Sequence, residues 1–245
     1  MPAFDLDATR AFGGTHRLYG QGAADKRARA PLTVVGIGGV GSWAAEALVR
    51  SGAQKLHLID ADQVAESNLN RQSQATIHTI GQTKTEALAE RLLAINPELE
   101  LRLSECFLSA DNLHLLSNSA YVVDAIDQVR VKKSMLDFCR SEKIPLVVCG
   151  AAGGKTRPEF LRVCDLSDTT HDGLLAALRR LCRQSAYPAQ GKMRVRCISS
   201  AEQNQSGKPA LDSAAGLACR GYGSSVMVTA SMGMMAASVV LNELL

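Results

Sequence analysis

Four short segments hold the residues whose types and spacing could support chemistry. They are Gly36-Ile37-Gly38-Gly39-Val40-Gly41, Asp60-Ala61-Asp62, Asn68-Leu69-Asn70-Arg71-Gln72 and Asp124-Ala125-Ile126-Asp127. The first is a glycine-rich turn, which lets the backbone approach a phosphate. The others supply carboxylate, amide and guanidinium groups. Together they indicate a nucleotide that is consumed as a substrate, because a merely bound cofactor does not require these acids and cations.

The glycine-rich turn lies between a strand pattern and a helix pattern. A β-branched apolar run covers residues 31–35, an alanine-rich helical pattern covers 42–49, and a second apolar run ends at Asp60. This order of elements is typical of a dinucleotide-binding unit, in which the helix N-terminus attracts an anion. An acid about 20 residues after the turn is placed to accept hydrogen bonds from ribose hydroxyls.

Strand and helix patterns alternate beyond this unit. Helices are predicted over 83–95 and 129–142, and strands over 99–103, 120–124 and 144–149. This alternation predicts an α/β fold with a Rossmann-like, doubly wound and mostly parallel sheet. Ligands of such sheets bind beyond the carboxyl ends of the strands. Four acids should gather at that edge: Asp60, Asp62, Asp124 and Asp127.

Two cations are placed to act on a polyphosphate. Arg71 and Lys84 lie 13 residues apart, and Lys84 falls in the first turn of a predicted helix. Two converging cations would neutralise the charge that builds on a leaving pyrophosphate. Asp127 could hold Mg²⁺, which prefers one or two carboxylates together with phosphate oxygens. Asn68 could bind phosphate or the metal shell.

The ordered set of motifs resembles the ThiF/MoeB/HesA adenylyltransferases, the superfamily of ubiquitin-activating enzymes. The resemblance covers residues 10–150 and includes Arg17-Leu18-Tyr19-Gly20 and Gly81-Gln82-x-Lys84. It implies activation of a carboxylate by MgATP, with Arg17 as an arginine finger that enters the site of a homodimer partner. The implied catalytic residues are Arg17, Arg71, Lys84 and Asp127, with Asp127 as the Mg²⁺ ligand. The implied ATP-binding residues are Gly36, Ile37, Gly38, Gly39, Gly41, Asp60, Asp62, Asn68, Arg71, Gln72, Lys84 and Asp127.

Within this family, the segments 12–20 and 221–230 are similar to the TcdA (CsdL) branch. Those enzymes are ATP-dependent dehydratases of threonylcarbamoyladenosine in tRNA. The MoeB and ThiF branches generally carry two Cys-x-x-Cys pairs for zinc, which this chain lacks, so no zinc is expected. One alternative is an adenylyltransferase that activates the C-terminus of a ubiquitin-like sulfur carrier. Another is an NAD-binding oxidoreductase or a catalytically silent nucleotide-binding module.

The positive charge is concentrated in one part of the chain. Residues 151–200 contain nine Lys or Arg against four Asp or Glu. A predicted helix over 173–184 should bury a leucine stripe and expose its arginines, and residues 192–196 would alternate along a strand. We expect the resulting basic face to contact the tRNA backbone. The candidate residues are Arg179, Arg180, Arg183, Lys192, Arg194 and Arg196.

The seven cysteines of the 245-residue chain are scattered and odd in number, which favours reduced thiols in the cytoplasm. Cys182, Cys197 and Cys219 are the candidates for a thiol role, and Cys219 best fits the TcdA branch. Such a role would imply a cysteine desulfurase or sulfur-acceptor partner. A dehydratase needs no thiol nucleophile, because intramolecular attack on an activated carbonyl suffices.

The C-terminal part is interpreted as an extension of a single ThiF-type domain, 1–245. Residues 10–150 would form the nucleotide-binding core, and 151–245 a part that faces the substrate and tRNA and forms the dimer. Residues 221–242 carry no charge. Their small residues favour a helix in the core or at a dimer seam over a membrane span or membrane contact. Residues 200–216 are expected to form a loop near the site.

Overall fold

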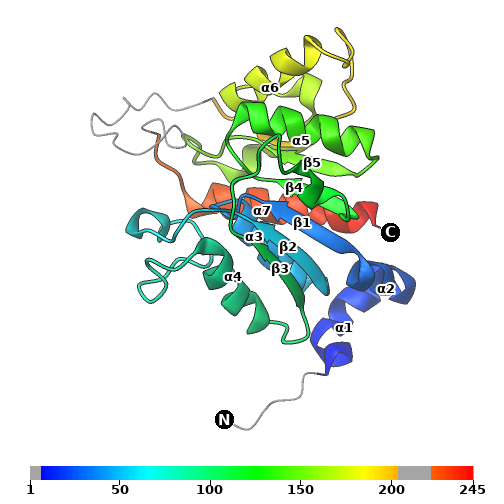
Figure 1. Ribbon diagram of the computed structural model, residues 1–245, viewed down its shortest axis with the longest axis vertical. Helices are drawn as coiled ribbons and strands as arrows, with labels where there is room; N and C mark the ends of the chain where they lie inside the picture. Colours follow the sequence, from blue (N-terminus) through cyan, green and yellow to red (C-terminus); the bar gives the residue numbers. More distant parts are fainter. Residues whose placement is uncertain (1–6, 204–221, 245) are drawn as a thin grey trace.

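The computed structural model describes residues 7–203 and 222–244. Its seven strands form one sheet in the order β3-β2-β1-β4-β5-β7-β6, and all neighbours are parallel except β6 and β7. The strands are β1 (Pro31–Val35), β2 (Lys55–Ile59), β3 (Glu100–Ser104), β4 (Tyr121–Asp124), β5 (Leu146–Cys149), β6 (Leu161–Asp165) and β7 (Arg196–Ser200) (Figure 1). The predicted doubly wound, mostly parallel sheet is confirmed, with a C-terminal extension that supplies β6 and β7.

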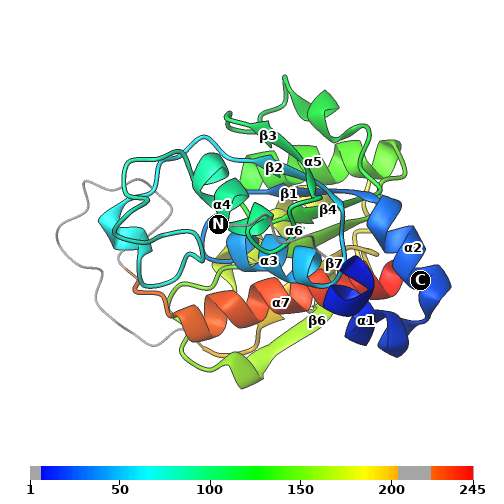
Figure 2. The same cartoon turned by 90° about the horizontal axis from the view of Figure 1, so that it is seen from below.

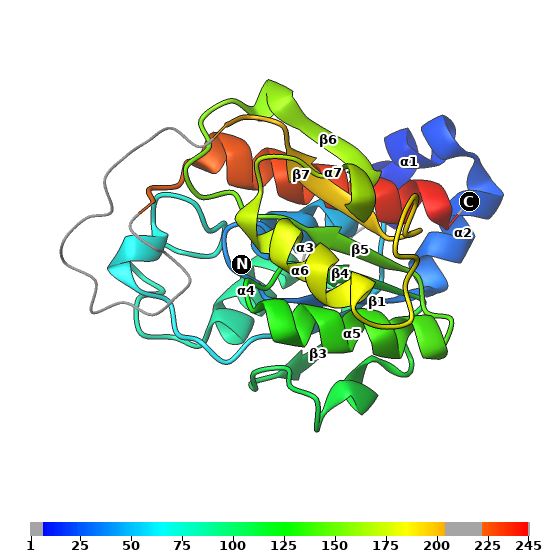
Figure 3. The ribbon, with the colours of Figure 1, turned by 90° about the horizontal axis from the view of Figure 1, so that it is seen from above.

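Helices cover both faces of the sheet. They are α1 (Ala8–Tyr19), α2 (Gln21–Arg29), α3 (Gly41–Arg50), α4 (Lys84–Leu93), α5 (Val129–Ser141), α6 (Gly173–Arg183) and α7 (Val226–Glu243). Side chains of α3, α4 and α7 share one core cluster with the strands, whereas α5 and α6 pack on the other face. Figures 2 and 3 show these two layers from opposite sides. The sequence patterns did not indicate α1 and α2.

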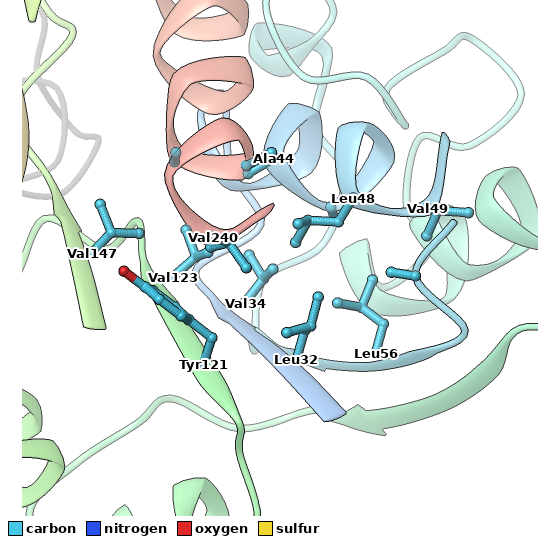
Figure 4. Close-up of a cluster of buried hydrophobic side chains, with 14 of the residues drawn as sticks. Leu32, Val34, Ala44, Leu48, Val49, Leu56, Tyr121, Val123, Val147 and Val240 are labelled. Carbon is cyan, nitrogen blue, oxygen red and sulfur yellow. The ribbon is translucent and has the colours of Figure 1, made fainter. Parts of the chain in front are cut away.

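The main core lies between the sheet and the pair α3–α7. Figure 4 shows Val34 and Val123 of the central strands facing Leu48 of α3 and Val240 of α7, and all four side chains are buried. After Pro31, every residue of β1 and β4 is buried, because both faces of these central strands are covered. The chain's C-terminal helix is therefore part of the core that supports the strand ends.

Close packing of α7 against α3 depends on Gly233. A Cβ atom on this residue would lie 2.4 Å from the Val40 carbonyl oxygen and 2.8 Å from the Ala44 nitrogen. Within the described residues, α7 is the one helix long and apolar enough to cross a bilayer by length and composition, and half of it is buried. The expected core helix is confirmed. Its outer face remains available for a subunit contact.

One predicted strand is wrong. Lys192 and Arg194 precede β7, which begins only at Arg196, and Arg194 has a φ of 55°. A positive φ breaks the extended alternation that would have placed the three cations on one face. These residues therefore do not form a common basic stripe.

We expect Gly233→Ala to lower the free energy of unfolding by about 1–3 kcal/mol, because the new methyl group meets backbone atoms that cannot rotate away. Urea denaturation measures the change. Gly22→Ala is the matched control, since nothing lies within 4 Å of a Cβ at that position in α2. An alanine there should stabilise the helix by about 0.5–1 kcal/mol. Equal effects of the two substitutions would contradict the packing argument.

Candidate active site

The glycine-rich turn lies where the strand order reverses. The chain proceeds from β1 to β2 and β3, then returns to place β4 beside β1. Gly36 follows β1 with a φ of 79°, and a Cβ there would lie 2.8 Å from Cγ2 of Ile126, in the loop after β4. A Cβ on Gly41 would lie 1.9 Å from the Gly36 oxygen. Glycine is thus required for the turn to close against the β4 loop, and the crevice that binds ligands in such sheets begins here.

Asp60 fixes the backbone of this turn. Its Oδ2 accepts a hydrogen bond from the Ile37 amide at 2.8 Å, and its Oδ1 accepts one from the Asp62 amide at 2.9 Å. On the other side of the turn, the Ile37 carbonyl accepts a 2.9 Å bond from Nε2 of Gln74. Ile37 is therefore held from both sides, with Asp60 at the expected place after β2.

Lys84 and Asp62 form an ion pair with an Nζ–Oδ2 distance of 2.6 Å. Lys84 is buried in the first turn of α4, after Thr83 caps the helix by accepting a bond from the Glu86 amide. The Lys84 amide also donates to the Asp62 carbonyl at 2.9 Å. These contacts place a desolvated cation next to Asp62, in the acidic segment that follows β2.

Arg71 lies over the turn. A Cβ on Gly39 would be 3.2 Å from the Arg71 side-chain carbons, so the turn leaves just enough room for the arginine stem. The Arg71 guanidinium donates to the Ser67 carbonyl at 2.6 Å and to Oδ1 of Asn70 at 2.9 Å. The backbone carbonyl of Arg71 accepts a 2.9 Å hydrogen bond from the Trp43 indole. The structure thus brings Arg71 to the glycine turn.

Asn68 has a local structural partner. Its Oδ1 accepts a bond from the Ala65 amide at 3.1 Å, which closes the short helix Glu66–Asn68. The side chain is buried, so its first task is to shape the loop that carries Arg71. Gln72 is also buried, and its Oε1 accepts a 3.2 Å bond from Gln74 beside the turn.

Asp127 is exposed at the end of the β4 loop and makes no side-chain hydrogen bond or ion pair with the residues the structure describes. Its carboxylate is free to take a cation. Asp124 has the opposite environment, because it is fully buried and its Oδ1 lies 2.8 Å from Nζ of Lys132. Lys132 also donates to the Cys149 carbonyl at 2.9 Å, so the pair joins the ends of β4 and β5 to α5. Burial raises the pKa of Asp124, and Lys132 opposes that rise.

The C-terminal extension completes the site. A Cβ on Gly39 would lie 3.2 Å from Cγ2 of Thr229, in the first turn of α7. Nδ2 of Asn70 donates to the Ser224 carbonyl at 3.0 Å, just before that helix. The glycine turn and the Arg71 loop therefore both contact the segment that leads into α7.

Arg17 lies in α1 and is exposed. Figure 1 shows α1 and α2 at the amino end of β1, opposite to the edge where the glycine turn begins. Arg17 is thus not brought to the site of its own chain.

The basic candidates separate into two groups. Arg179 donates to the carbonyls of Leu166 and Thr169, Lys192 pairs with Asp168, and Arg196 pairs with Glu243. Three others make no side-chain hydrogen bond or ion pair within 7–203 and 222–244: Arg180, Arg183 and Arg194. Arg179 is a poor candidate for tRNA, because its guanidinium holds the segment before α6 in place.

Two of the candidate thiols are buried and unreactive. Burial raises the pKa of Cys182 to about 11 and that of Cys197 well above its usual value, so neither supplies a thiolate near neutral pH. Cys219 lies outside the described residues, as does nearly all of the loop expected over 200–216.

Sequence reasoning missed three contributors to this geometry. Gln74 and Trp43 hold the turn and the Arg71 loop, and Lys132 neutralises the buried acid of β4. Gln74 stands two residues after a named motif, and Trp43 is the chain's one tryptophan, next to the turn. The spacing of Asp124 and Lys132 also fits a strand end facing the second turn of a helix.

We expect Lys132→Met to lower the free energy of unfolding by about 3–5 kcal/mol, because it leaves the Asp124 carboxylate buried without its cationic partner. Adding Asp124→Asn should recover part of this loss in a double-mutant cycle followed by urea denaturation. Lys55→Met is the control, since Lys55 and Glu100 form an exposed pair worth about 0–1 kcal/mol. A loss no larger than that of the control would contradict the assignment.

Comparison with known proteins identifies the family. A family model described as the ThiF family matches residues 15–244. The tRNA threonylcarbamoyladenosine dehydratase of Escherichia coli (strain K12) is 41% identical over 254 residues, which covers 96% of this chain and 93% of the relative. The Haemophilus influenzae protein of the same name is 38% identical with the same coverage. The crystal structure of the Escherichia coli enzyme, TcdA, in complex with ATP has a TM-score of 0.88 at 40% identity and covers 99% of this chain and 97% of that chain. The chain belongs to the ThiF family.

Proposed function

We propose that the protein is an ATP-dependent dehydratase of threonylcarbamoyladenosine in tRNA. The observation that carries this proposal is the likeness to dehydratases of that name over nearly the full length of both chains, including the extension beyond the nucleotide-binding core. Residues 10–150 bind the nucleotide in this proposal, and 151–245 serve the tRNA and the subunit contact. A cytoplasmic location fits the free cysteines and a tRNA substrate.

Different residues of the chain have different roles in the proposed adenylation step. The glycine turn receives the phosphates of ATP, and Asp60 accepts bonds from the ribose. The threonyl carboxylate attacks the α-phosphorus, and the bond to the leaving pyrophosphate breaks. Lys84 and Arg71 neutralise the charge that develops on that leaving group. Asp127 would hold a Mg²⁺ ion, which would supply further positive charge.

The second step needs no protein nucleophile. A nucleophilic atom of the same modified side chain attacks the activated carbonyl, and AMP leaves with the former carboxylate oxygen. The ring closes at high effective concentration, because both groups belong to one nucleoside. The burial of Cys182 and Cys197 agrees with a route that bypasses a thioester.

We also propose a homodimer in which Arg17 enters the partner's site. Its position away from its own glycine turn supports this arrangement. Exposed apolar side chains support a subunit contact on the same molecule, namely Leu18 beside Arg17 and Met227 and Met234 on α7. Sedimentation of the active protein as a monomer would contradict it.

We expect the pure protein with Mg²⁺ to release AMP in the presence of tRNA that bears threonylcarbamoyladenosine, and the nucleoside to lose the mass of one water molecule. Asp127→Ala should reduce AMP release at least about 100-fold. Its stability should stay within about 0.5 kcal/mol of the parent, because the side chain is exposed. ATP–pyrophosphate exchange driven by a carrier protein ending in Gly-Gly, without any need for tRNA, would instead establish the sulfur-carrier activator. Full turnover by the Asp127→Ala variant would exclude the assigned metal ligand.

We expect Arg180→Glu and Arg183→Glu each to weaken tRNA binding by about tenfold at low salt and to reduce the salt dependence by about one phosphate contact. ATP affinity should not change, because α6 makes none of the contacts to the glycine turn described above. Filter binding over a range of salt concentrations measures both effects. Arg102→Glu, an exposed charge reversal on β3, is the control. Unchanged tRNA affinity of both α6 variants would remove this surface from the proposal.

A further inference from the structure

Lys155 is a buried cation at the carboxyl edge of the sheet, and it is not one of the residues assigned to the nucleotide. Lys155 is 2% exposed and belongs to the loop that follows β5, residues 150–157. Its Nζ donates to the His171 carbonyl at 2.8 Å and to the Glu202 carbonyl. One ammonium group therefore joins three segments that are distant in sequence: the loop after β5, the residues before α6, and the end of β7.

Two buried acids hold the same loop at its ends. Asp172 accepts a 2.9 Å bond from the Ala151 amide with one oxygen and caps α6 with the other. The Glu202 carboxylate accepts bonds from the amides of Thr156 and Arg157 at 3.0 Å and from the Thr156 hydroxyl at 2.9 Å. Both acids also attract Lys155 electrostatically, which offsets part of the cost of burying its charge.

This loop is linked to the nucleotide side of the site by a short series of contacts. The Gly154 amide donates to the Gly223 carbonyl at 2.9 Å, and the next carbonyl, that of Ser224, accepts from Asn70. Asn70 in turn accepts from the Arg71 guanidinium. The loop also lies at the carboxyl end of β5, which is the neighbour of β4, where Asp127 is placed.

We propose that Lys155 is a positioning residue for the acyl half of the site: it fixes the 150–157 loop as the wall that holds the carboxylate-bearing end of the tRNA substrate against the nucleotide. This assignment rests on the proposed dehydratase function. The glycine turn itself is held by separate contacts from Asp60 and Gln74, and Lys84 pairs with Asp62, so removal of the Lys155 donors leaves these contacts in place. Burying a triad of charges is costly, and Asp172 and Glu202 each bond to the loop that carries Lys155.

The test replaces Lys155 with Met, which keeps the length of the side chain and removes its donors. We expect the dissociation constant of ATP to stay within about twofold, while kcat for tRNA-dependent AMP release falls at least about tenfold. Amide hydrogen exchange of Ala151, Thr156 and Arg157 should accelerate in the protein without substrates. Thr156→Val is a milder second variant that removes one bond to Glu202, and it should lower kcat in the same direction. Lys55→Met is the matched control.

The possible results distinguish failure of the positioning role of Lys155 from failure of the proposed dehydratase function. Unchanged kcat in both variants, or a loss of ATP affinity that parallels the loss of kcat, overturns the positioning role. A lower melting temperature alone, with normal kcat, also overturns it and leaves Lys155 a structural residue. If the parent protein releases no AMP with the modified tRNA, the dehydratase function fails, and the assignment of this wall to a tRNA carboxylate fails with it. Amide exchange then still reports whether Lys155 holds the loop.

Discussion

Close contact between the backbone at Gly36 and the loop after β4 is the constraint on which the rest of the site depends. It exists because β1 and β4 are parallel neighbours at the point where the strand order reverses. A side chain at Gly36 or Gly41 would separate the two loops by collision with Ile126 or with the turn itself. Since the turn and Asp127 stand on these two loops, any separation would move the backbone of the turn away from the Asp127 carboxylate.

Buried charges also fix the carboxyl edge of the sheet. Lys132 ties Asp124 to the end of β5, and Lys155 ties the loop after β5 to β7 and α6. Each ammonium group is desolvated and therefore requires its acceptors at fixed positions. The strand ends are thereby held in register with one another. A site assembled from the loops of several strands gains from such rigid supports, because misplacement of about 1 Å is enough to slow a reaction severely.

The charged side chains discussed above thus fall into two groups. Arg179, Lys132 and Lys155 are satisfied inside the protein and determine its shape. Arg180, Arg183 and Asp127 are exposed and make no side-chain hydrogen bond or ion pair within the described residues. A count of positive charges cannot distinguish these groups, because a guanidinium on a helix looks the same in sequence whether it faces a carbonyl or the solvent.

The sequence by itself determined the fold class, the order of the main strands and helices, and the glycine turn with Asp60, Arg71 and Lys84 around it. These features follow from local patterns, namely hydrophobic periodicity and residues at fixed spacing after a strand. Only the tertiary structure decided the antiparallel edge strand β6, the helices α1 and α2, and the approach of α7 to Gly39. It also decided which arginines of the basic segment are free, and it showed that Lys192, Arg194 and Arg196 do not share a strand face. These features depend on contacts between residues far apart in the chain, and on a positive φ at Arg194. No local pattern records which distant carbonyl, carboxylate or helix a side chain will meet.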